Sequence, residues 1–329
     1  MTRIAYLGNF QHPWCTEVHL ARELEGLGHA VHRIQEPPGG AEATFLPVIE
    51  TQAGEFGADV LFFQRTWGLP AEATALWRRL EASGCLTASY HLDLYRGLAR
   101  EERLHRDPFW TTGYVFTPDG NPESQEWFEA QGINHHYMPP GVVSDECYRG
   151  TFRPELAHDV VFVGSLGYHP EYPWRGEMIG RLESAYGDRF VRYGGDTGYT
   201  VGGKRHAGPI RGAHLNDLYA SAKVIVGDSC FAHRGQRYTS DRPWETTGRG
   251  GFIVNPRIDM LRHLLPIPAI DYFEPADFGS LRAVIDHWLV TFDRDPALRT
   301  ELTGTSLEWV REHGSYRNRL AGALEVIGL

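Results

Sequence analysis

The residues with the clearest chemical potential lie in one stretch of the chain, Tyr238–Asn255. Within it Arg242 stands three residues before Glu245, both where a short helix is expected to begin, and glycines and an apolar strand follow. An arginine fork binds phosphate oxygens, a carboxylate accepts hydrogen bonds from two neighbouring hydroxyls, and a helix N-terminus favours anions. The pattern therefore predicts a nucleotide site with Arg242 on a diphosphate and Glu245 on a ribose.

Both residues also have simpler explanations. Glu245 could be a first-turn acid that the helix dipole favours, and Arg242 could form a surface ion pair with Asp241 or Glu245. If the nucleotide interpretation holds, Arg242 is a catalytic candidate, because a fixed cation stabilises the charge that builds on a leaving diphosphate. The hydroxyls of Thr246 and Thr247 could then add donors to the phosphates.

Strands alternate with helices in both halves of the chain. In the first half, apolar runs and helical spacing predict strands at 3–8, 30–34, 58–63, 86–90 and 114–117 and helices at 16–27, 71–83 and 122–131. After a Pro- and Gly-rich segment at 138–154, expected to be a linker, they predict strands at 159–163, 189–193, 223–226 and 251–254 and helices at 175–186, 215–222, 278–291, 296–313 and 316–327. The fold class is therefore α/β, with two doubly wound parallel sheets and a ligand cleft between them.

Residues just beyond predicted strands are further candidates, because strand C-termini face the ligand crevice of a doubly wound sheet. For donor phosphates, base or ribose these are Gly164, Ser165, Tyr193 and Gly194, together with Arg211 and Gly212 before a later helix. For a donor or acceptor loop they are Gly8, Asn9, Phe10, Arg65 and Trp67. For catalysis they are His91 and Asp93, where Asp93 binds a hydroxyl or acts as a base. A helix cap at Ser165, a satisfied polar pair at His91 and Asp93, and a core or hinge aromatic at Trp67 are the structural alternatives.

Several segments in order resemble GT-B glycosyltransferases, and among them the CgeB-like branch related to the retaining family 4 enzymes of bacterial or phage type. The resemblance is good over residues 155–329 and weaker before them, and it rests on Asp159–Ser165, Leu215–Val226, Ser240–Val254 and Ser315–Arg319. It implies two Rossmann-like domains: an N-terminal acceptor domain at 1–145 and a donor domain at 155–313. It also implies a last helix, within 314–329, that crosses back to the first domain.

The resemblance assigns roles to individual residues. Glu245 matches the glutamate that binds the ribose hydroxyls, and Arg211 and Gly212 match the segment that holds the nucleobase. His91, by its place just past a strand end and not by a match to the family, is expected to contact the transferred sugar. The family 4 pattern has a second glutamate eight residues earlier, where this chain has Arg237. That departure leaves the sugar and the stereochemistry of transfer open.

Composition limits the partners. The formal net charge is −10, and residues 1–150 carry −9 of it, with 11 Arg, no Lys and 20 Asp and Glu. Duplex DNA needs a cationic path, so a DNA acceptor is disfavoured. The four cysteines are widely spaced and no metal-ligand spacing occurs, so no disulfide or metal is expected. The chain has neither a long apolar run nor a signal-peptide layout, which favours the cytoplasm with no membrane span.

The sequence thus predicts a glycosyltransferase that moves a hexose from a nucleoside-diphosphate sugar to a hydroxyl. A UDP-sugar is favoured over GDP- or ADP-sugars on family frequency, and the resemblance implies a retaining, metal-independent reaction without a cofactor. The acceptor could be a glycan, a small molecule or a hydroxymethylated DNA base, and the oligomeric state is open. The alternatives are a non-catalytic nucleotide-sugar-binding protein and an NAD-dependent oxidoreductase, the latter disfavoured because GxGxxG is absent.

Overall fold

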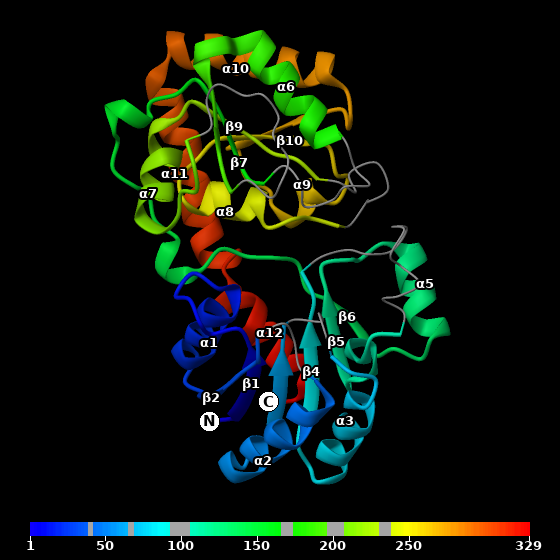
Figure 1. Ribbon diagram of the computed structural model, residues 1–329. Coiled ribbons are helices and arrows are strands. Elements are labelled where there is room, and N and C mark those ends of the chain that lie inside the picture. The colour runs from blue at the N-terminus through cyan, green and yellow to red at the C-terminus, as the bar shows by residue number, and fades with distance from the viewer. Residues whose placement is uncertain (39–41, 65–68, 93–105, 166–173, 196–206, 230–237) are drawn as a thin grey trace. The chain divides into compact units, whose positions relative to one another are not determined.

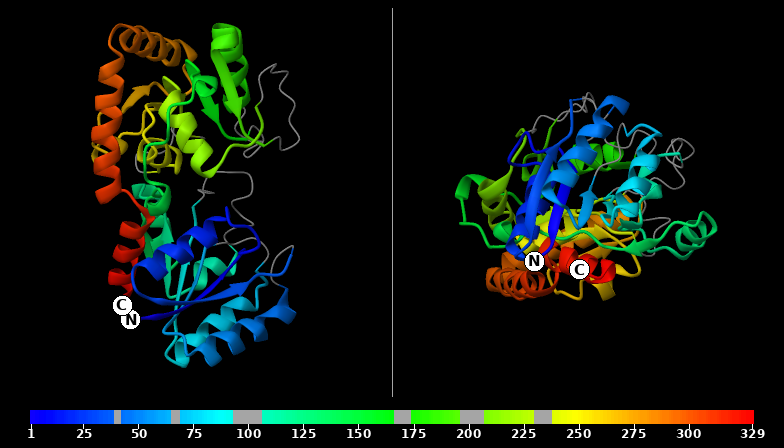
Figure 2. Two further views of the ribbon diagram at one scale, coloured as in Figure 1. Left: turned by 90° about the vertical axis from the view of Figure 1, so that its left-hand side faces the viewer. Right: turned by 90° about the horizontal axis from the view of Figure 1, so that it is seen from below.

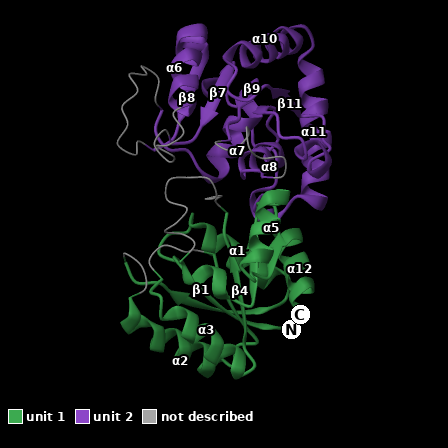
Figure 3. Ribbon diagram, turned by 90° about the vertical axis from the view of Figure 1, so that its right-hand side faces the viewer, with its two compact units in different colours: residues 1–140, 316–329 green, residues 141–315 purple. Residues whose placement is uncertain are grey.

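The chain forms two compact units, each built on one parallel sheet (Figures 1 and 3). The computed structural model describes residues 1–38, 42–64, 69–92, 106–165, 174–195, 207–229 and 238–329. Unit 1 consists of Met1–Pro140 and Tyr316–Leu329, and unit 2 of Gly141–Ser315. Within the described ranges, no helix is both long enough and apolar enough to cross a membrane.

Unit 1 holds a parallel sheet of six strands in the order β2-β1-β3-β4-β5-β6. The strands are β1 (Arg3–Gly8), β2 (Ala30–Gln35), β3 (Val60–Phe63), β4 (Leu86–Tyr90), β5 (Tyr114–Thr117) and β6 (His135–Tyr137). The helices are α1 (Thr16–Gly26), α2 (Leu46–Phe56), α3 (Ala73–Ala82), α5 (Pro122–Ala130) and α12 (Tyr316–Ile327). Parallel neighbours need crossover connections, so helices cover the sheet and its inner strands β1, β3, β4 and β5 are buried on both sides.

The two faces of this sheet use alternate residues of each strand. Leu61 and Phe63 of β3 pack with side chains of α2 and α3. Val60 and Phe62, which alternate with these residues along β3, lie on the opposite face of the sheet. There they face α1 and α12 around a void of about 10 Å³. The short apolar runs that predicted these strands are therefore runs buried on both faces.

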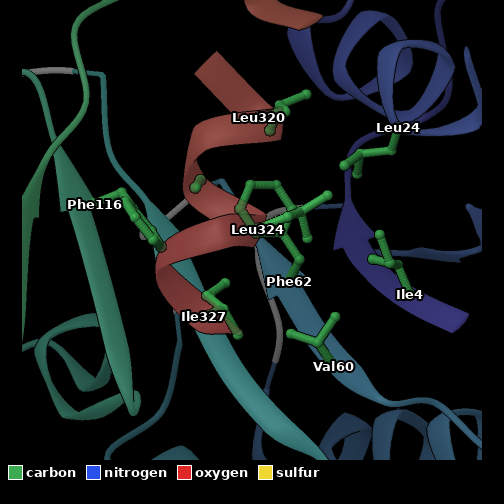
Figure 4. A pocket seen from close by; sticks show the side chains of 9 residues that line it. Ile4, Leu24, Val60, Phe62, Phe116, Leu320, Leu324 and Ile327 are labelled. Atoms are coloured by element: carbon green, nitrogen blue, oxygen red, sulfur yellow. The ribbon is translucent and has the colours of Figure 1, made fainter. Parts of the chain in front are cut away.

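Helix α12 completes unit 1 although it comes last in the chain. Leu320, Leu324 and Ile327 point at the sheet in Figure 4, together with Leu24 of α1. At its start, Arg317 Nε lies 3.1 Å from Glu23 Oε2 of α1. The two chain ends consequently lie side by side in unit 1 (Figure 2).

Unit 2 holds a parallel sheet of five strands in the order β11-β10-β9-β7-β8. The strands are β7 (Val160–Val163), β8 (Phe190–Tyr193), β9 (Val224–Val226), β10 (Ile253–Pro256) and β11 (Ile270–Phe273). Helices α6 (Trp174–Tyr186) and α10 (Phe278–Arg294) pack on one face. Side chains on the other face pack with α7 (Gly212–Ser221), α8 (Arg242–Gly248) and α11 (Pro296–His313). The short helix α9 spans Leu261–Leu264.

Among the described elements of the sheets and their covering helices, α2, β6 and β11 were not predicted from the sequence. Helix α2 has a proline in its first turn, β6 reads His-His-Tyr, and β11 has only the four residues Ile-Asp-Tyr-Phe. Residues 141–154, expected as a linker from their composition, pack within unit 2. There Asn216 Nδ2 of α7 donates to the carbonyl oxygens of Glu146 and Tyr148 at 2.9 and 2.8 Å.

The packing of α12 can be tested with two substitutions in the same helix. Leu324→Ala enlarges an existing void, so we expect unit 1 to lose about 2–5 kcal/mol in its free energy of unfolding in urea. Val326→Ala, at a side chain 45% exposed, is the matched control and should change it by less than about 0.5 kcal/mol. Equal effects of the two substitutions would contradict the assignment of the buried face.

Candidate functional site

Arg242 lies at the carboxyl edge of the second sheet and begins α8. Its Cζ is 4.6 Å from the centre of the Phe162 ring on β7, and its Nη2 lies close over Gly164. Nη1 is buried and has no hydrogen-bond partner among the described residues. Burial lowers the pKa of Arg242, and the neighbouring charge of Arg175 adds to this. Arginine nevertheless keeps its proton, so the site holds a cation with unmet hydrogen-bonding capacity. Helix α8 has only seven residues, so this side chain, and not the helix dipole, supplies the positive charge.

A second arginine, which the sequence analysis missed, stands beside Arg242. Arg175, on α6, donates from Nε to Asp228 Oδ2 at 2.7 Å and from Nη1 to the Ser165 carbonyl oxygen at 3.0 Å. Its Cζ is 6.0 Å from the same Phe162 ring. The positions of Ser165 and Asp228 after two strands were a signal for this cluster, but nothing in the sequence pairs Asp228 with Arg175.

The cluster contains buried polar atoms without hydrogen-bond partners. Asp228, whose side chain is fully buried, pairs with Arg175, and the charges of Asp228 and Asp241 both act on Arg242. Asp228 Oδ1 and Ser229 Oγ, like Arg242 Nη1, have no hydrogen-bond partner within the described ranges. Buried polar groups are usually satisfied, so these atoms indicate a place for a polar ligand, and Arg242 Nη1 would donate to an anionic group of that ligand.

The glycines after β7 and β8 bring these strand ends together. Gly164 N donates to the Tyr193 carbonyl oxygen at 2.8 Å. A Cβ on Gly194 would lie 2.2 Å from the Gly164 carbonyl oxygen, and the φ angles of Gly164 and Gly194 are +154° and +153°. Close backbone packing therefore accounts for Gly194, and the side chains of Arg242 and Phe162 account for Gly164. The contact of either glycine with a ligand stays a prediction.

Glu245 follows one turn after Arg242 and is held by Arg249. Arg249 Nη2 donates to Glu245 Oε1 at 3.1 Å and also pairs with Glu146. Burial raises the pKa of Glu245 while Arg249 opposes the shift. The Glu245 side chain lies deep among its neighbours but remains 35% exposed, so it is accessible from solvent. The role of Arg249 was not predicted from the sequence.

The two threonines after Glu245 are both fully buried. Thr246 Oγ1 has no hydrogen-bond partner among the described residues, and its contact with a phosphate stays a prediction. The Thr247 hydroxyl donates to the Pro243 carbonyl oxygen at 2.7 Å, within the helix. Its proton is therefore not available to a phosphate, and we do not include Thr247 in the site.

Tyr193 and Arg211, both predicted for the nucleotide, line one groove of about 430 Å³. Its apolar floor includes Leu156 and Ile210, and Tyr193 places its hydroxyl 3.0 Å from His158 Nε2. Gly212, with φ +54°, begins α7 directly after Arg211, and its carbonyl oxygen lies 3.5 Å from Arg249 Nη1. The groove thus adjoins the segment that supports Glu245.

The predicted residues of unit 1 lie after β1 and β4. Gly8 is covered by Glu17, whose Cγ would be 2.7 Å from an added Cβ. Asn9 Oδ1 accepts from Gln11 N at 3.2 Å, and Phe10 packs edge-on to Tyr6 with 5.3 Å between ring centres. His91 is 5% exposed and packs edge-on to Phe109 at 5.0 Å. Buried packing thus surrounds His91, and its contact with a sugar stays a prediction.

Other predicted positions, Arg65, Trp67 and Asp93, lie outside the described residues, as does Arg237. In the part of the chain that the structure describes, no group of three or more His, Cys, Asp or Glu side chains could hold a metal ion. The predicted cleft concerns the arrangement of the two units and stays a prediction.

Comparison with known proteins supplies the fold. No family model and no curated protein matches the chain. A glycosyltransferase from Rickettsia africae is similar over 99% of this chain and 97% of its own, with a TM-score of 0.63 and 12% identity. A trehalose-6-phosphate protein from E. coli, bound with UDP-2-fluoro glucose, covers 98% of each chain with a TM-score of 0.63 and 10% identity.

A proposed UDP-N-acetylglucosamine 2-epimerase from Listeria monocytogenes is also similar, with a TM-score of 0.56 and 10% identity over 98% of this chain and 96% of its own. At these identities the likeness shows the fold alone, and one fold can carry different chemistries. With its two parallel α/β sheets, the chain has the GT-B fold of these glycosyltransferases.

Proposed function

We propose that the protein is a glycosyltransferase that moves a hexose from a nucleoside-diphosphate sugar to an acceptor hydroxyl. The observation that carries this proposal is the buried Nη1 of Arg242, which has no partner among the described residues and lies beside Arg175 at the ends of β7 and β9. A diphosphate would supply acceptor oxygens and negative charge to the unpartnered Nη1 of Arg242.

The chemistry proposed for the cluster is stabilisation of the leaving group. When the bond between the sugar and the diphosphate breaks, negative charge builds on the diphosphate. Arg242 and Arg175 would meet that charge where little water competes. Asp228 holds Arg175 in place and offsets one of the two positive charges before the donor arrives. In this proposal the guanidinium groups do the work of a metal ion.

The remaining donor contacts follow from the same surface. The Glu245 carboxylate, whose side chain is accessible from solvent, would accept from the ribose hydroxyls, and the groove at Tyr193 and Arg211 would take the base. We favour UDP as the nucleotide, and the similar E. coli protein bound with UDP-2-fluoro glucose supports this choice.

We further propose retention of the anomeric configuration, as the resemblance to the CgeB-like branch and family 4 implies. The leaving phosphate then takes the acceptor proton, so no dedicated base is required. The acceptor would be a glycan or another small molecule. A hydroxymethylated DNA base is a weaker proposal, because residues 1–150 carry a formal charge of −9.

A donor screen tests the function. Purified protein is incubated with UDP-, GDP- and ADP-sugars, and both its thermal shift and the release of nucleoside diphosphate are measured. A ligand at 100 times its Kd adds about 2.7 kcal/mol to stability, which is readily seen. Binding with slow hydrolysis supports a transferase. Binding without turnover would favour a non-catalytic binding protein, epimerised UDP-N-acetylglucosamine would favour an epimerase, and no binding at all would contradict the proposal.

Arg242→Met is predicted to lower affinity for UDP about 10- to 150-fold in calorimetric titration, because it removes a charge-assisted contact worth about 1.5–3 kcal/mol. Thermal stability without ligand should stay unchanged or rise, since the replaced cation is buried and lacks an ion pair among the described residues. Arg181→Met on α6, at an exposed arginine paired with Glu177, is the control and should bind UDP normally. If Arg242→Met binds UDP with the same affinity as Arg181→Met, Arg242 does not contact the diphosphate.

The affinity for UDP is predicted to fall on mild acidification. The pKa of Glu245 is raised above its ordinary value of 4.5, so its carboxylate is protonated, and loses acceptor capacity, at a higher pH than an exposed glutamate. UDP itself titrates in the same region, so Glu245→Gln is measured in parallel by titration from pH 8 to about pH 5. The wild-type protein should lose more affinity than the variant, and parallel curves would argue against a ribose contact by Glu245.

A further inference from the structure

Arg249 is a buried charge that the proposed chemistry does not use directly. It ends α8, and its backbone N donates to the carbonyl oxygens of Glu245 and Thr246 at 3.1 and 3.3 Å. The residue is only 3% exposed. Its side chain therefore lies inside unit 2, one helical turn after the carboxylate proposed to bind ribose.

The guanidinium group of Arg249 joins three elements. Nη2 contacts Glu245 of α8 and Glu146, which belongs to the 3₁₀ turn Ser144–Glu146. Nη1 contacts Asn216 Oδ1 of α7 and, at 3.5 Å, the Gly212 carbonyl oxygen. These contacts fix the plane of the guanidinium group from two sides, so the position of Nη2 is set before any ligand binds.

The electrostatics make Glu245 depend on this arginine. Burial raises the pKa of Glu245, and the acidic neighbours Asp241 and Glu146 push it in the same direction. Arg249 is the first group that opposes the shift, with Arg242 a weaker second. Burial raises the pKa of the Tyr219 hydroxyl on α7, and the charge of Glu245 raises it further. Without Arg249, the carboxyl group would hold its proton to higher pH and its rotamer would be unrestrained.

The Glu245 side chain is held by Arg249 and is still partly exposed. Oε1 accepts from Arg249, while the side chain is 35% exposed against 3% for Arg249. One oxygen is therefore anchored, and the carboxylate can present its other lone pairs to a ligand in a fixed direction. A carboxylate held in this way can accept hydrogen bonds from the two neighbouring hydroxyls of a ribose. A deoxyribose lacks one of these hydroxyls and leaves one acceptor position of the carboxylate without a donor.

We propose that Arg249 is a positioning residue that makes the site selective for ribonucleotide over deoxyribonucleotide donors. This inference rests on the proposed function, because it takes Glu245 as the ribose contact. Arg249 touches no substrate and acts by fixing the Glu245 carboxylate. Selectivity then comes from the pair, and substituting either member removes it.

The test measures the ratio of the Kd for 2′-deoxy-UDP to the Kd for UDP by calorimetric titration. If the wild-type protein binds GDP or ADP more tightly than UDP, that nucleotide and its 2′-deoxy form are compared instead. The wild-type ratio should be about tenfold or more, since one hydrogen bond to a charged acceptor is at stake. Arg249→Met should bring the ratio within about twofold of one. If this variant does not fold, Arg249→Lys keeps the charge but not the fork, and its ratio should fall below the wild-type ratio.

Arg299→Met is the matched structural control. Arg299 is also a deeply placed arginine of unit 2, but it donates to the carbonyl oxygens of Tyr219, Ala220 and Lys223 and does not contact Glu245. It should lower stability and leave the ratio unchanged. Glu245→Gln should bring the Kd ratio close to one. If it does, a folded Arg249 variant that keeps the wild-type ratio would overturn the inference. If the wild-type protein binds no nucleotide, or if Glu245→Gln keeps the wild-type ratio, the proposed function of Glu245 fails instead.

Discussion

The guanidinium group of Arg242 is a charge at the end of a sheet with its Nη1 buried, and the rest of the site can be understood from that constraint. It packs on the Phe162 ring and over Gly164, which leaves no room for a side chain there. A buried donor such as Nη1, which has no hydrogen-bond partner among the described residues, costs stability, so its surroundings must hold it in place. The packed strand ends at Gly164 and Gly194 provide that rigid frame.

The same design recurs at each charged group of the site. Asp228, at the end of β9, orients Arg175, and Arg249, at the end of α8, orients Glu245. In both pairs one member is almost fully buried and the other has more contact with solvent. Preorganised charges cost little reorganisation when a ligand binds, which is what recognition of a diphosphate and a ribose requires. The supporting contacts come from α6, α7 and the segment around Glu146, so the site is built from most of unit 2.

The sequence was sufficient for the fold class and for the motif, but not for the partners of that motif. Strands β1 and β5 were predicted to the residue, because strands buried on both faces read as short apolar runs. Polar or very short elements such as β6 carried no such signal. Arg242 and Glu245 stood out because they lie three residues apart in one stretch. The residues that support them did not stand out, because Arg175 is 53 residues from Asp228 and Arg249 is 103 from Glu146. The burial of Thr247 is likewise set by tertiary packing.

A crystal structure of the protein with UDP tests the central claim most directly. The account predicts diphosphate oxygens within hydrogen-bonding distance of Arg242 Nη1 and of the Arg175 guanidinium group. It also predicts ribose hydroxyls on the Glu245 carboxylate, with the contact between Glu245 and Arg249 preserved. A nucleotide bound elsewhere in unit 2, with Arg242 Nη1 still lacking a ligand, would contradict it.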